Sequence, residues 1–99
     1  MEFDIRDTGN EITASLSGQL GFQDNGDFRR LVAGLDDDGK ALVLDLTGLD
    51  FIDSAGLGML LVLKESHERA VRLRTAPGQV ARLLELARFS DFFSIETFP

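Results

Sequence analysis

The sequence has no cysteine, tryptophan or tyrosine, and it has one histidine, His67. Without cysteine the chain forms neither a disulfide framework nor a thiolate metal site. A single histidine excludes a metal site built from several histidines and leaves few arrangements for acid–base catalysis. Since tryptophan and tyrosine, the usual rigid anchors of protein interfaces, are missing, we expect the eight phenylalanines in the core.

Basic residues are also scarce, because ten Lys and Arg stand against seventeen Asp and Glu, giving a net charge of −7. This balance argues against nucleic-acid binding, which depends on neutralising phosphates, and against an anionic membrane surface. The longest apolar run, residues 59–63, is far shorter than the roughly 20 residues that span a bilayer. The first residues do not form a basic start followed by an apolar stretch, so no targeting segment is predicted. We expect a cytoplasmic protein without membrane insertion.

The first half of the chain shows both strand and helix patterns. Alternating apolar residues predict strands at 3–5 and 12–16, with the second strand interrupted by glycines at 18–21. Apolar residues at helical spacing predict a helix over 28–35, capped by Asp24 or Asn25 and ended by the acidic turn at 36–39. The nearly unbroken apolar run at 41–46 predicts a strand covered on both faces.

In the second half, we expect a loop over 47–53, a helix over 54–69 and a strand over 71–75. Pro77 suits the first position of a further helix. The buried face of that helix is predicted to consist of Val80, Leu83, Leu84 and Ala87. The apolar tail, with Phe89, Phe92, Phe93 and Ile95, is expected to form a short final element packed on the sheet. The order β-β-α-β-α-β-α predicts an α/β fold, a mixed β-sheet covered by helices. With 99 residues, the chain is expected to form one domain over 1–99.

The most informative segment is 50–58, which follows the buried strand and opens a helix. Ser54 lies at the predicted N-cap or first turn, where its hydroxyl can simply accept a backbone N–H. Gly56 and Gly58 each cost about 1 kcal/mol relative to alanine inside a helix. That cost indicates either tight helix–sheet packing or close approach by a ligand or partner. A phosphate on Ser54 fits a helix N-terminus, and it adds about −1.5 to −2 charges beside Asp50 and Asp53.

Competing motifs are incomplete. A serine nucleophile elbow needs glycine where Ile52 stands, and His67 lies about 20 Å further along the same predicted helix, too far to act as a base. The glycines at 56 and 58 lack the third glycine of a dinucleotide fingerprint, and the acidic turn at 36–39 lacks the other ligands of a calcium loop. The sequence therefore argues against Ser54 as the nucleophile of a hydrolase.

The sequences LDLT at 44–47 and FIDSAGLG at 51–58 resemble the signature of STAS domains, the anti-sigma factor antagonists. The loop LSGQL at 16–20 is similar to the family's Gly-Glu-Leu-Asp loop, and Ala76-Pro77 opening a helix also fits. The resemblance covers nearly the whole chain and implies the STAS fold.

The resemblance also implies a phosphorylation switch. An anti-sigma factor with serine kinase activity is expected to phosphorylate Ser54, and the unphosphorylated chain is expected to bind that kinase and free a sigma factor. A PP2C-type phosphatase resets the switch. The chain itself is then a substrate and a binder, not an enzyme, and needs no cofactor. The residues expected at the partner interface are Gln19, Gly21, Asp24, Asp50, Asp53, Ala55, Gly56, Leu57 and Gly58.

One segment departs from the family pattern. The family's Gly-Glu-Leu-Asp loop, whose aspartate aids recognition by the kinase, reads GQLG at 18–21 here, so both acids are replaced. Asp24 is the candidate substitute. The alternative function is a non-switching STAS subunit or scaffold, such as an accessory subunit of a lipid-transport ABC complex, in which Ser54 only caps the helix.

Overall fold

The computed structural model describes residues 1–35, 39–66 and 70–98. The acidic turn at 36–38 and His67 lie outside these ranges, so the structure does not test the predictions made for them. The elements in chain order are β1 (Glu2–Asp7), β2 (Glu11–Leu20), η1 (Phe22–Asp24), α1 (Asn25–Gly34), β3 (Ala41–Ile52), α2 (Ser54–Ser66), β4 (Val71–Thr75), α3 (Gln79–Leu86), η2 (Phe89–Asp91) and β5 (Ser94–Thr97).

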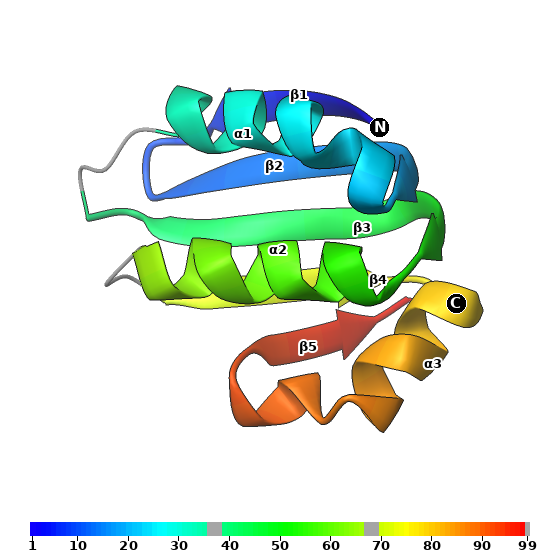
Figure 1. Cartoon of the computed structure of the whole chain (residues 1–99). Helices are drawn as coiled ribbons and strands as arrows, with labels where there is room; N and C mark the ends of the chain where they lie inside the picture. The colour runs from blue at the N-terminus through cyan, green and yellow to red at the C-terminus, as the bar shows by residue number, and fades with distance from the viewer. Residues whose placement is uncertain (36–38, 67–69, 99) are drawn as a thin grey trace.

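The strands form one five-stranded sheet in the order β1-β2-β3-β4-β5. β1 is antiparallel to β2, and each later strand is parallel to its neighbour, so the sheet is mixed as predicted. In Figure 1, α1 and α2 lie over the same face of the sheet, α1 packed against β1 and α2 against β3. The predicted α/β fold is confirmed, and the apolar tail supplies an additional edge strand, β5.

Period-two alternation explains the core. Alternate residues are buried in β2 over 12–16, in β3 over 42–46 and in β4 over 71–75, and the residues between them in β2 and β4 are half-buried. The buried members of these strands include Ile12, Ala14, Leu16, Leu42, Leu44, Leu46, Val71 and Leu73. The helices add Phe28, Leu31, Leu60 and Leu63 to the same cluster. In the described ranges, no helix reaches the length and apolarity that crossing a bilayer requires.

Two sequence boundaries were wrong because strand pairing continues further than the local pattern indicates. β2 does not stop at Gly18 but runs to Leu20, since it pairs with β3 out to Ile52. A register shift follows Gly18, whose φ of +86° favours glycine. The predicted loop over 47–53 is therefore mostly strand.

The end of β3 is also held from its other side. The pairing between β3 and β4 stops at Asp45, so no strand of the described residues pairs with Ile52 on that side. The side chain of Gln79, at the start of α3, fills the gap. Its Oε1 accepts the Ile52 N–H at 3.0 Å and its Nε2 donates to the Ile52 carbonyl at 2.8 Å. One amide side chain thus satisfies both backbone groups.

The predicted start of α3 at Pro77 was wrong as well, because the helix begins at Gln79. Gly78 precedes it with a φ of +144°, a conformation that residues with a side chain rarely adopt. The chain therefore turns at Pro77 and Gly78 before the helix begins.

Candidate functional site

Ser54 is the first residue of α2 and is exposed. It follows directly from the carboxyl end of β3, the edge of an α/β sheet where binding sites collect. Within the described residues its hydroxyl has no hydrogen-bond partner, so of the two interpretations of Ser54 the structure does not support the one in which it caps the helix. The cap is Asp53, whose Oδ1 accepts the Gly56 N–H at 2.9 Å. The Ser54 hydroxyl is consequently free for chemistry or binding.

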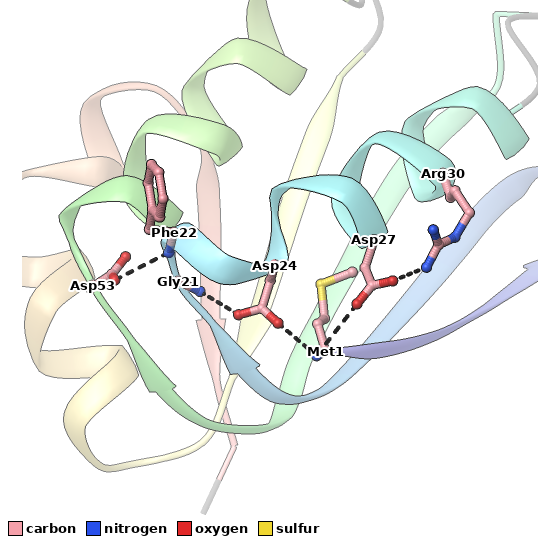
Figure 2. A network of polar contacts seen from close by, with 7 residues as sticks. All are labelled: Met1, Gly21, Phe22, Asp24, Asp27, Arg30 and Asp53. Carbon is pink, nitrogen blue, oxygen red and sulfur yellow. Dashed lines mark hydrogen bonds and ion pairs between the residues drawn. The ribbon is translucent and has the colours of Figure 1, made fainter.

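Asp53 also ties the helix start to the neighbouring turn. Its Oδ2 accepts the Phe22 N–H at 3.3 Å, and its own N–H donates to the Leu20 carbonyl at 3.3 Å. Figure 2 shows the contact between Phe22 and Asp53. One carboxylate therefore fixes the geometry of both α2 and η1.

A side chain at position 21 collides with the Asp53 carboxylate as it lies in this structure. A Cβ at this position lies 2.7 Å from Asp53 Oδ2, well inside contact distance. Its N–H donates to Asp24 Oδ2 at 2.8 Å. An acid at position 21, as in the family pattern, requires Asp53 to move, so the departure at this position matches the local packing of this chain.

Asp24, the candidate substitute acid, is engaged within the chain. Its Oδ1 accepts a hydrogen bond from the Met1 ammonium at 2.8 Å. This bond, followed by the bond from the Gly21 N–H, holds the pKa of Asp24 below its usual value. The ammonium is also 3.9 Å from Asp27, which pairs with Arg30, as Figure 2 shows. Both oxygens of Asp24 are thus occupied internally.

Asp50 differs from Asp53 and Asp24. It is exposed near the end of β3 and has no hydrogen-bond or ion-pair partner among the residues that the structure describes. Of the acids predicted at the site, Asp50 is the one whose carboxylate is free to meet a partner.

The two helix glycines have different surroundings. A Cβ on Gly56 lies 2.2 Å from the Leu20 carbonyl oxygen and 2.7 Å from Ile52 Cγ1, so this glycine is needed for the contact between helix and sheet. A Cβ on Gly58, which is exposed, meets no atom of the described residues within 4 Å. Tight packing of the helix on the sheet therefore explains Gly56. For Gly58, close approach by a partner stays a prediction.

The other predicted contact residues have mixed exposure. Gln19 is exposed at the end of β2, and Ala55 and Leu57 are half-buried in the first turn of α2. Leu57 packs against the core. The structure brings the ends of β2 and β3 and the start of α2 together, but it leaves the role of each residue in binding as a prediction.

Sequence reasoning missed two aromatic residues at this site. The expectation that all eight phenylalanines are core was wrong, because Phe22 is 77% exposed, Phe51 is 42% exposed, and Phe92 and Phe98 are exposed too. A hollow of about 290 Å³ is lined by Gln19, Gly21, Phe22, Gln23, Asp24, Phe51 and Asp53. A signal was present: Phe22 stands outside the helical spacing that starts at Phe28, and Phe51 alternates with the buried Ile52.

Comparisons with known proteins agree with the architecture. A family model described as "Mlab, STAS domain" matches residues 3–96. A STAS-domain containing protein of Pseudomonas aeruginosa (strain UCBPP-PA14) is 28% identical over 90 residues, covering 88% of this chain and 89% of its own. An anti-sigma factor antagonist from Mycobacterium paratuberculosis has a similar structure, with a TM-score of 0.86 and 21% identity over 95% of this chain and 83% of its own. The structure of the anti-sigma factor antagonist SpoIIAA in its unphosphorylated form is also similar, with a TM-score of 0.61 and 18% identity. The match covers 99% of this chain and 90% of SpoIIAA.

Proposed function

Since the chain belongs to the STAS-domain family, we propose that it is an anti-sigma factor antagonist that works by partner switching through Ser54. The unphosphorylated form binds an anti-sigma factor with serine kinase activity and frees its sigma factor or other regulator. Phosphorylation of Ser54 abolishes that binding, and a PP2C-type phosphatase restores it. In this role the chain is a binding protein and a substrate, not an enzyme.

The observation that carries the proposal is the state of the Ser54 hydroxyl. It is exposed at the first position of α2 and unbonded within the described residues, because Asp53 caps the helix in its place. A serine retained for capping uses its oxygen on a backbone N–H. A serine that a kinase modifies needs the reverse, an accessible hydroxyl oxygen, and Ser54 meets this condition.

Electrostatics supports the proposal that phosphorylation of Ser54 weakens binding. The Gly56 N–H that points toward the helix start is already taken by Asp53, and the exposed Asp50 lies four residues before Ser54 in the chain. A phosphate adds about −1.5 to −2 charges beside these acids. In a packed interface that charge loses its water and is repelled by neighbouring carboxylates, so binding weakens. Because the helix end is already fixed by Asp53, little backbone change is expected.

We include the residues around Ser54 in the proposed binding surface. They are the ones predicted from the sequence: Gln19, Gly21, Asp24, Asp50, Asp53, Ala55, Gly56, Leu57 and Gly58. Among these, Asp24 and Gly56 support the shape of the surface, because their partners lie within the chain. Asp50 and Gly58 are exposed and are proposed to touch the partner directly.

A second candidate is a non-switching STAS subunit, such as an accessory subunit of a lipid-transport ABC complex. One observation favours it. The loop at 18–21 carries no acid, and Gly21 has no space for one while Asp53 stays in place. If kinase recognition depends on that acid, the kinase does not recognise this chain.

Phosphopeptide mass spectrometry on the native protein, followed by binding assays, decides between the two. Partner switching predicts phosphate on Ser54 that varies with growth condition, and at least about a tenfold loss of affinity for Ser54→Asp. Ser90→Asp is the matched control, because Ser90 is also an exposed serine in a helical turn and lies in η2. Unmodified Ser54 under all conditions, with a partner that co-purifies equally with Ser54→Asp, establishes the constitutive subunit instead.

A further inference from the structure

Two exposed phenylalanines stand at one edge of the Ser54 site. Phe22 belongs to η1 and Phe51 to the end of β3, and both line the same hollow as Asp53. We call this pair the aromatic patch. The larger exposed fraction, 77% for Phe22, leaves most of a phenyl ring in water, an arrangement unfavourable for an isolated chain. The core does not need the ring, so its position calls for another explanation.

The backbone beneath the aromatic patch is rigidly held. The Phe22 N–H donates to Asp53, the Gly21 N–H donates to Asp24, and the Asp24 N–H returns to the Gly21 carbonyl at 2.9 Å. Phe51 precedes Ile52, whose two backbone groups are bound by Gln79. Both rings are thus presented from fixed backbone, which lowers the entropy lost when they are buried in a partner.

Charge narrows the class of partner. The aromatic patch adjoins Asp53 and follows the exposed Asp50, and the whole chain carries a net charge of −7. An anionic lipid surface is repelled by this combination. A protein whose apolar pocket is rimmed by Arg or Lys is complementary to it, since guanidinium groups pair with carboxylates and also stack on phenyl rings.

We propose that Phe22 and Phe51 are the anchor residues of the partner interface and enter an apolar pocket of a protein partner whose rim carries Arg or Lys. Anchors of this kind are large side chains buried at the centre of an interface and ringed by polar contacts. The identification of that partner as the anti-sigma factor rests on the proposed function. The anchoring role of the patch does not.

The first test is photocrosslinking in the native cells with the full chain. The photoreactive p-benzoylphenylalanine is introduced separately at positions 22 and 51. Positions 86 and 98 serve as matched controls, because Leu86 and Phe98 are 72% and 42% exposed against 77% and 42% for the patch. The proposal requires one protein to be crosslinked from 22 and 51 but not from 86 and 98. The crosslinked peptide should combine apolar residues with Arg or Lys.

The second test uses that protein in purified form. Phe22→Ala and Phe51→Ala should each weaken binding about tenfold or more by calorimetry, as expected for anchor residues. Leu86→Ala and Phe98→Ala should change it by less than about twofold. Thermal unfolding of every variant verifies that the fold is retained.

The proposal is overturned by absent crosslinks at 22 and 51, by crosslinks to lipid or to a second copy of this chain, or by equal labelling at the control positions. Unchanged affinity of Phe22→Ala and Phe51→Ala overturns it too. The proposed function is judged separately, from whether the crosslinked protein is an anti-sigma factor kinase and whether Ser54→Asp releases it. Either conclusion can therefore fail while the other stands.

Discussion

Phenylalanine has opposite roles at two places in this molecule. In the C-terminal cluster, Phe89 and Phe93 are 3% and 4% exposed and stack with ring centroids 5.6 Å apart. At the Ser54 site, Phe22 is 77% exposed and Phe51 is 42% exposed. The C-terminal rings are buried because η2 and β5 fold back on α3 and β4, as Figure 1 shows. The ring of Phe22 projects from a short turn, η1, and is exposed.

The two regions are also held together by different forces. The C-terminal cluster depends on apolar packing, whereas the Ser54 site depends on carboxylates that accept backbone N–H groups. Asp53 accepts the N–H groups of Phe22 and Gly56. Asp24 accepts the N–H group of Gly21. Substitutions in the first region should therefore reduce stability. Substitutions of exposed groups in the second should change binding while stability is kept.

The largest effect on stability is expected for Phe89→Ala. Removing a buried ring from the C-terminal cluster should cost about 3–5 kcal/mol of unfolding free energy, because contacts are lost and a cavity remains. Phe22→Ala should stay within about 0.5 kcal/mol of the parent, since its ring is exposed. Urea unfolding followed by circular dichroism measures both. Equal losses for the two variants contradict the contrast between the regions.

The next largest effect concerns the two glycines of α2. Gly56→Ala should lose about 1–3 kcal/mol, because the new methyl group collides with the Leu20 carbonyl oxygen. Gly58→Ala should instead gain up to about 1 kcal/mol of unfolding free energy from helix propensity, since its methyl group meets no atom within 4 Å in the described part of the chain. Chemical denaturation of the pair gives the signs, and a destabilised Gly58→Ala variant contradicts the assignment of Gly58 as unpacked.

A smaller loss is expected when the helix cap is removed. Asp53→Ala should cost about 1–2 kcal/mol, because the Gly56 and Phe22 N–H groups both lose their acceptor. Asp50→Ala, which removes an exposed carboxylate of the same site, is the control and should change stability by less than about 0.5 kcal/mol. Matching values for the two variants mean that Asp53 is not the cap.

The smallest effect is a dependence on pH. The folded-state pKa of Asp24 is lowered, first by the Met1 ammonium and then by the Gly21 N–H. Its contribution to stability is therefore complete above the unfolded pKa of about 3.9 and is lost as pH falls through the folded value. The unfolding free energies of the parent protein and the Asp24→Asn variant should differ by about 1 kcal/mol near pH 6 and become equal toward pH 2. Urea midpoints across this range measure the difference, and a gap that widens in acid contradicts the sign.

Local patterns predicted much of the fold and part of the site. Alternation located β2 and β4, helical spacing located α1, and the segment around Ser54 indicated a site at the start of α2. The errors fell where distant segments decide the outcome. β3 extends to Ile52 because β2 pairs with it and Gln79 completes its hydrogen bonds, and no residue near Ile52 encodes either partner.

The sequence by itself determined which residues alternate, which share a helical face, and that a serine opens a helix beside acids, because these features depend on neighbours a few positions apart. Only the tertiary structure decided which groups are occupied. Asp24 is bound to Met1 across 23 positions, Phe22 to Asp53 across 31, and Ile52 to Gln79 across 27. Such contacts form only when the sheet closes, and they leave Ser54, Phe22 and Phe51 facing solvent.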